Sequence, residues 1–225
     1  MASRRPTPPP TDLHRARLCW SPVAEGNPRF SYYNRLSAKA KAIYRKGDAI
    51  ASVLLPGDLE LRGRLHGAAE AVGHALAEAR PSRVRAAAQR ICDLVTEALG
   101  TERVAVSILR ARPRRAASEL HGLYTRDDGK PATIRLWMRT AARGDVVKPR
   151  TFLRTLVHEL CHHLDYTHYR LGDSFHNPGF FKRESSLMRQ LAPRAEKKPE
   201  KKPVKKKVQR EAVQAKAKAR QLELF

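Results

Sequence analysis

The sequence predicts an α+β domain with a basic tail, and three observations indicate this class. Helical patterns, with apolar residues three and four positions apart, come first along the chain. Short stretches rich in β-branched residues follow, and two more helical patterns close the domain. Beyond residue 193 the chain becomes rich in Lys, Ala and Pro, a composition that cannot bury a core. We therefore expect an irregular Pro-rich segment at 1–30, one domain at 31–193, a disordered tail at 194–220 and a short apolar end at 221–225.

The first half of the domain is expected to be helical. Three helices are predicted, over residues 32–48, 65–80 and 83–99. Gly47 and Gly100 are the expected ends of the first and third helices, and Ser82 is the expected N-cap of the third. The apolar stretch between the first two helices is too short to classify by periodicity.

The strands and the last two helices follow. Strands are predicted at 103–109, 119–125 and 132–138, and the Asp-Gly turn of "RDDGKP" should join the last two as a hairpin. Thr151 can cap a helix that runs to about Tyr166. Asn177 and Pro178 are typical of an N-cap and a first helical residue, and this last helix should stop at Pro193.

The composition restricts the compartment and the partners. The net charge of +23 indicates a polyanionic partner. The three cysteines form no CxxC pair, so a disulfide framework is not expected and the compartment should be reducing. There is no secretory signal at the N-terminus and no apolar stretch of the ~20 residues needed to span a bilayer. We expect a soluble cytoplasmic protein without membrane contact, associated with the nucleoid.

The stretch "TLVHELCHHLD" at 155–165 carries the pattern His-Glu-x-x-His. On a helix, His158 and His162 lie on one face, one turn apart, and can chelate one metal ion. Neutral imidazoles bind Zn²⁺ and leave a position open for water. Glu159 follows the first histidine and can accept a proton from that water. The alternative is a pair of histidines whose hydrogen bonds are satisfied within the core.

A catalytic zinc site needs a third protein ligand. The sequence offers four candidates, His163, His168, His176 and Glu184. His163 points about 100° away from His162 around the helix, and His168 is too far along it. His176 follows a loop that can fold back, whereas Glu184 lacks the usual context of a glutamate ligand.

The two elements "HELCHH" and "FHNPGFF" resemble those of the SprT-like zinc metallopeptidases. In that family a HExxH helix is followed by a loop and a His-Gly-x-x-Phe element; here Asn177 stands in place of the glycine. The resemblance covers roughly residues 34–192. It implies a small zincin-like fold with a helical N-terminal part and a short β-sheet beside the active-site helix. It also implies Glu159 as the general base and three zinc ligands, His158, His162 and His176.

Three further expectations concern the surroundings of the site. In such folds a sheet edge can hold an extended peptide, and the strand at 132–138 is either that edge or an ordinary core strand. Asp165 or Asp173 could orient a ligand histidine, or could serve as a cap or surface group. Cys161 is expected to be a small buried apolar residue.

The tail between 194 and 220 contains 12 Lys and Arg against 3 Glu. Together with "RPSRVRAAAQR" and "RARPRR" in the domain, it indicates contact with DNA rather than with an acidic membrane, because the tail lacks the aromatic and large apolar anchors that insert into a membrane. The expected contacts are Lys197, Lys198, Lys201, Lys202, Lys205, Lys206 and Lys207.

The chain ends in "QLELF", an apolar cluster with no core to join. This pentapeptide resembles the motif that binds the bacterial sliding clamp, and the expected contacts are Gln221, Leu222, Leu224 and Phe225. The alternative is the last turn of an amphipathic helix that begins near Gln209.

These observations predict a zinc-dependent metalloprotease that acts on a protein or peptide substrate. Its charge would bring the protein to DNA, and its C-terminus would bring it to the clamp. A protease held there would suit the repair of DNA that carries bound or crosslinked proteins. One rival is a non-catalytic nucleic-acid-binding protein with a structural zinc ion, although such a site has no need of Glu159. Another is a general cytosolic peptidase, which the clamp-like terminus disfavours.

Overall fold

A computed structural model describes the chain at residues 30–111, 121–127, 129–141 and 143–192. By its contacts the chain divides between Pro193 and Arg194, and all of the described residues belong to the first unit. They form five α-helices, one 3-10 helix and a three-stranded sheet, so the predicted α+β class is confirmed.

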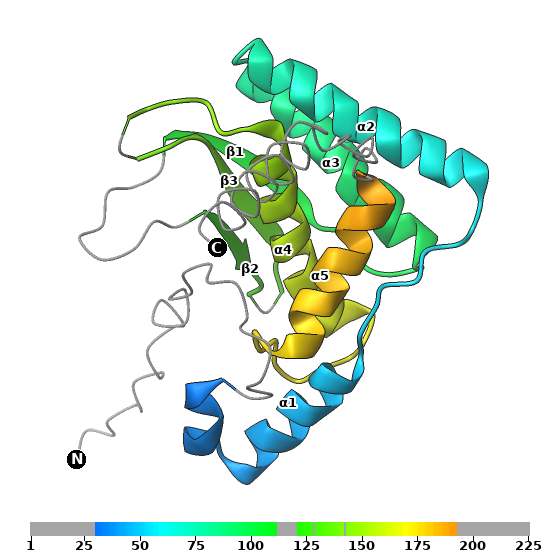
Figure 1. The fold of residues 1–225 in the computed structure, drawn as a ribbon, viewed down its shortest axis with the longest axis vertical. Helices are drawn as coiled ribbons and strands as arrows, with labels where there is room; N and C mark the ends of the chain where they lie inside the picture. The colour runs from blue at the N-terminus through cyan, green and yellow to red at the C-terminus, as the bar shows by residue number, and fades with distance from the viewer. Residues whose placement is uncertain (1–29, 112–120, 128, 142, 193–225) are drawn as a thin grey trace, which may run out of the picture. The chain divides into compact units, whose positions relative to one another are not determined.

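The elements follow one another as the hydrophobic patterns predict (Figure 1). In chain order they are η1 (Ser31–Arg35), α1 (Ala38–Ala49), α2 (Leu59–Ala77), α3 (Pro81–Ala98), β1 (Ala105–Ala111), β2 (Gly122–Thr125), β3 (Thr133–Arg139), α4 (Pro149–Thr167) and α5 (Pro178–Leu191). Three helices thus precede the sheet and two follow it.

The sheet has the strand order β1-β3-β2. β3 is parallel to β1 and antiparallel to β2, with Gly122 opposite Leu136 and Thr125 opposite Thr133. The predicted hairpin is therefore confirmed. The expectation that residues 132–138 could form a substrate-binding edge is wrong, because β3 has a partner on each side. β2 is an edge strand of the described sheet.

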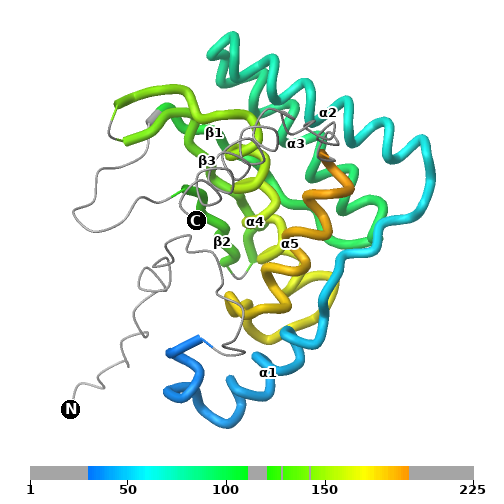
Figure 2. The backbone as a smooth tube through the Cα atoms, in the orientation of Figure 1, coloured from blue at the N-terminus to red at the C-terminus, as the bar shows by residue number. Residues whose placement is uncertain are grey.

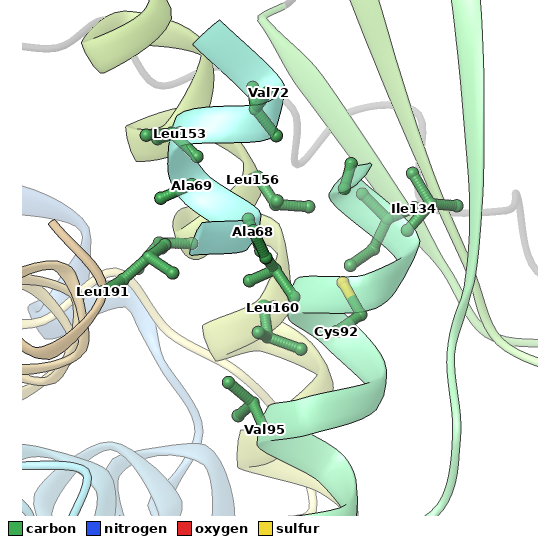
Figure 3. Close-up of a cluster of buried hydrophobic side chains, with 14 of the residues drawn as sticks. Ala68, Ala69, Val72, Cys92, Val95, Ile134, Leu153, Leu156, Leu160 and Leu191 are labelled. Carbon is green, nitrogen blue, oxygen red and sulfur yellow. The ribbon is translucent and has the colours of Figure 1, made fainter. Parts of the chain in front are cut away.

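α4 lies between the sheet and α5, with contacts to β2, β3 and α5 (Figure 1). Its apolar side meets α2, α3 and the sheet in one hydrophobic core (Figure 3). The core residues labelled there are Ala68, Ala69, Val72, Cys92, Val95, Ile134, Leu153, Leu156, Leu160 and Leu191. This packing holds the HExxH helix rigidly, since side chains on several elements interlock around it.

The segment between α1 and α2 runs alongside α5 (Figure 2). Gln190 donates a hydrogen bond of 2.8 Å to the carbonyl oxygen of Val53, and Tyr169 donates one of 2.9 Å to that of Ser52. These contacts join α1 to the second half of the domain, so the N-terminal helix is fixed beside α5 although it is distant in sequence.

The helix starts differ from the expected ones except at α5, which begins at Pro178 with Asn177 as its N-cap. Ser82 and Thr151 are not N-caps, because α3 and α4 begin earlier, with Pro81 and Pro149 in the first turn. Proline suits that position, where its missing N–H would have no partner in any case. α2 begins at Leu59 because the side chain of Asp58 caps it. The first predicted helix is divided, since Ser37 is extended and caps α1.

Several sequence predictions lie outside the described residues. These are the segment at 1–29, the lysine-rich tail with its proposed DNA contacts, and the clamp-like pentapeptide at 221–225. In the part of the chain that is described, no helix has the length and apolar character required to cross a membrane.

Candidate metal centre

The His-Glu-x-x-His pattern lies in the middle of α4. His158 and His162 project from the same side of the helix, and their ring centroids are 5.0 Å apart. Glu159 and Cys161, the neighbours within the motif, are buried. The helix therefore presents two imidazoles together while the rest of the motif packs inward.

His176 reaches this pair from the loop between α4 and α5. Its Nε2 atom lies 2.9 Å from Nε2 of His158 and 3.1 Å from Nε2 of His162. One nitrogen from each of the three rings lies within 4.8 Å of the others, and among the described residues this is the group that could hold a metal ion. Of the four sequence candidates for a third ligand, the structure brings His176 to the pair.

The loop that carries His176 is fixed on both sides. Tyr32, in η1, donates a hydrogen bond of 2.8 Å from its hydroxyl to the carbonyl oxygen of His176. Asn177 caps α5 by accepting a bond of 2.7 Å from the N–H of Phe180, and its amide donates one of 3.0 Å to the carbonyl of Tyr44. Asn177 thus gives the loop two buried hydrogen bonds. Glycine, which the SprT-like metallopeptidases have at the corresponding position of their motif, has no side chain to form them.

Phe180 packs against all three histidines. Its ring centroid is 5.0 Å from that of His158, 4.7 Å from that of His162 and 5.0 Å from that of His176. Phe180 is fully buried. This aromatic residue, four positions after His176, closes the inner side of the site with an apolar surface that excludes water.

Glu184 lies behind His158 and is not part of the converging group. Its carboxylate accepts a hydrogen bond of 3.1 Å from Nδ1 of His158 and one of 2.8 Å from Nε of Arg154. A histidine that donates from Nδ1 has its Nε2 lone pair available for a metal. The contact explains why this glutamate is buried: it orients His158, and Arg154 balances its charge.

His162 is held by a second, longer connection. Its Nδ1 lies 2.7 Å from the hydroxyl oxygen of Ser174, which donates a bond of 2.8 Å to Asp165. Asp165 forms a buried ion pair of 2.9 Å with Arg183. Burial raises the pKa of Asp165, and the charge of Arg183 opposes that rise. Asp165, one of two candidates for orienting a histidine, is connected to His162 through Ser174.

The electrostatics favour a cation among the three rings. Burial and the neighbouring imidazoles hold the pKa of His162 well below its usual value and lower that of His176 to about 3. Burial also lowers the pKa of His158, but its hydrogen bond to Glu184 and the charges of Glu159 and Glu184 outweigh this and raise the pKa overall. Two of the imidazoles are therefore neutral at pH 7, the state in which imidazole binds metals.

The donor set fits zinc. A tetrahedral ion with Zn–N distances of about 2.0–2.1 Å requires nitrogens roughly 3.3 Å apart. The distances from Nε2 of His176 to Nε2 of His158 and of His162, 2.9 and 3.1 Å, are within a few tenths of an ångström of that value. Three imidazole donors that leave a fourth coordination position for water are typical of catalytic rather than structural zinc sites.

Glu159 lies directly beneath the edge strand β2. A Cβ atom added at Gly122 would come within 2.5 Å of its Oε1 atom, so only glycine lets the strand pass this close. Burial raises the pKa of Glu159, while the charge of His158 and a hydrogen bond from the backbone of Tyr124 lower it in part. The carboxylate is thus placed between the histidines and the backbone of β2.

The other residues considered from the sequence lie elsewhere. His163 faces away from the site; it bonds the carbonyl of Glu102 at 2.7 Å and lies 3.3 Å from the hydroxyl of Tyr124. His168 is the exposed C-cap of α4. Asp173 accepts bonds from Tyr166 and from the backbone of Ser174. Cys161 is buried as expected.

Sequence reasoning missed four residues that shape the site, namely Gly122, Ser174, Gly179 and Arg183. A Cβ at Gly179 would meet the backbone of Gly47 and Asp48, so this glycine lets α5 approach α1 closely. A glycine inside a predicted strand or near a helix start does signal a close backbone approach. For Ser174 no such signal exists, since a loop serine is common.

Comparison with known proteins gave no significant match. No protein-family model, no curated protein and no solved structure matches the chain. The resemblance to SprT-like peptidases accordingly depends on the two motifs and on the residues that surround them.

Proposed function

We propose that the protein is a zinc-dependent metallopeptidase of the SprT-like type, with a zincin-like fold. The observation that carries the proposal is the convergence of three imidazole Nε2 atoms beside a buried glutamate. The position of the motif helix α4 next to a small sheet, with helices before it in the chain, supports the zincin-like part of this proposal.

The residues have distinct roles in this proposal. His158, His162 and His176 would hold the ion. Bound zinc would supply a Lewis acid that makes water a nucleophile near neutral pH. Glu159 would accept a proton from the attacking water and deliver it to the leaving amine nitrogen. Phe180 keeps the inner side of the site apolar, which strengthens each of these electrostatic interactions.

The edge strand β2 is the proposed binding position for the substrate. It begins at Gly122, in contact range of Glu159, and β3 occupies its other side. An extended peptide added along β2 would be held by backbone hydrogen bonds, largely independent of its side chains. The peptide bond would then lie close to the general base.

We further propose that this peptidase acts on proteins bound or crosslinked to DNA. The support is the charge of +23, the lysine-rich tail and the clamp-like end. If "QLELF" is a clamp ligand, a peptide of residues 209–225 binds the purified bacterial clamp at micromolar concentration. Replacing Leu224 and Phe225 together by alanine then abolishes binding, while Glu223→Ala does not. Equal binding by all three peptides would contradict the assignment.

Casein cleavage by the purified zinc-loaded protein, with and without DNA, tests the function. The proposal expects cleavage that a zinc chelator abolishes and that DNA stimulates. Zinc binding without any cleavage would favour the rival, a nucleic-acid-binding protein with structural zinc. An equal rate of casein cleavage with and without DNA would favour a general peptidase.

A further inference from the structure

A buried chain of polar contacts leads from His162 into the core of the domain. The hydroxyl oxygen of Ser174 lies 2.7 Å from Nδ1 of His162 and 2.8 Å from Oδ2 of Asp165. Asp165 is fully buried and Arg183 is 1% exposed. Buried charges are costly unless they are paired and hydrogen-bonded, and even a paired one adds little stability. The buried pair of Asp165 and Arg183 therefore suggests a role other than stability.

The direction of each hydrogen bond follows from the far end of the chain. Arg183 approaches both oxygens of Asp165, at 2.9 Å and 3.1 Å, and such a carboxylate can only accept. Ser174 must therefore donate its single proton to Asp165. Its oxygen can then only accept from Nδ1–H of His162, and this fixes the tautomer of that ring with Nε2 bare.

Arg183 attaches this chain of contacts to the rest of the domain. Its guanidinium also donates to the carbonyl oxygens of Gly47 and Ile50, at the C-terminal end of α1. The position of Ser174 is thus tied to α1, α4 and α5 together. Ser174 also lies on the loop that carries His176, so one short loop supplies the third histidine and orients the second.

From this arrangement we infer that Ser174, supported by Asp165 and Arg183, is a positioning residue for the metal centre. It holds His162 with its Nε2 lone pair aimed at the point where the three imidazoles meet. The inference rests on the proposed zinc site, and it adds a residue to that site which the HExxH pattern does not contain.

The test is metal binding by the full-length protein after removal of metal with a chelator. Ser174→Ala should weaken Zn²⁺ binding on the order of 10–100-fold and change the visible absorption spectrum of the Co²⁺-loaded protein. Ser174→Thr keeps the hydroxyl and should largely restore both. Ser186→Ala is the matched control, because it removes a buried serine hydroxyl that bonds the carbonyl oxygen of Val53, away from the histidines.

The outcomes separate this inference from the proposed function. If Ser174→Ala matches the wild type in Zn²⁺ affinity and Co²⁺ spectrum, the positioning role is wrong and the zinc site stands. If Ser186→Ala loses as much affinity as Ser174→Ala, the effect is a general loss of packing and the role is likewise wrong. If the wild type binds no Zn²⁺, the proposed function fails and this inference fails with it.

Discussion

Replacing Gly122 by alanine should remove most of the proposed peptidase activity and leave binding at the proposed zinc site unchanged. The added methyl group would lie 2.5 Å from Oε1 and 2.7 Å from Cγ of Glu159, and 2.8 Å from Cγ2 of Thr155, where ordinary contacts begin near 3.4 Å. Glu159 or the strand must therefore move by about 1 Å. A displacement of that size can cost about 100-fold in rate, or about 2.7 kcal/mol of transition-state stabilisation.

The assay is kcat/KM on a casein or peptide substrate, alongside zinc content and thermal unfolding. Gly67→Ala is the matched control, since a Cβ at this exposed position in α2 meets nothing within 4 Å. It should retain full activity and gain about 0.5–1 kcal/mol in stability. A folded Gly122→Ala protein with wild-type kcat/KM would refute the idea that the base is held against β2.

Other predictions test the ligands, the tail and the pH response. His176→Ala should lower zinc occupancy far more than His168→Ala; the reverse result would exclude His176 as the third ligand. The association constant for DNA should fall steeply with salt concentration, by about 0.9 log units per log unit of salt for each phosphate contact. Deletion of residues 194–220 should flatten that slope; an unchanged slope would exclude the tail as a DNA contact. In metal-free protein the pKa of His176 is about 3, whereas that of a histidine in the unfolded chain is 6.5. Between these values the unfolded state binds more protons than the folded state, so the free energy of unfolding falls as the pH drops below 6.5. Urea unfolding at pH 4–6.5 should show a weaker pH dependence in His176→Gln, by up to about 1.4 kcal/mol per pH unit; equal dependence would contradict this assignment.

The features that depend on local spacing could be predicted from the sequence. Two histidines four positions apart on a helix lie on the same face. Asn177 before Pro178 caps α5 because its side chain can accept a hydrogen bond from a free backbone N–H of the first turn. The turn at Gly129 produced the expected hairpin. The starts of α3 and α4 were misplaced because Pro81 and Pro149 were not treated as first-turn residues, although the same rule placed α5 correctly.

The features that depend on tertiary contacts could not be predicted. The hydrophobic pattern predicts each strand but not the order β1-β3-β2. The strand at 132–138, considered as the substrate-binding edge, is therefore the central one. Ser174 orients His162 only because Asp165 and Arg183, distant along the chain, meet behind it. Glu184, considered as a ligand, instead bonds Nδ1 of His158, and sequence spacing does not encode this difference of a few ångströms.

The substitution Glu159→Gln isolates the proposed role of Glu159 as the general base of a zinc peptidase. Glutamine is nearly the same size and can occupy the same buried position, but its amide cannot accept the proton of water. Zinc content and casein cleavage should be measured on the same preparation. Zinc content should remain at the wild-type level while cleavage is lost. Wild-type cleavage by Glu159→Gln would contradict this role.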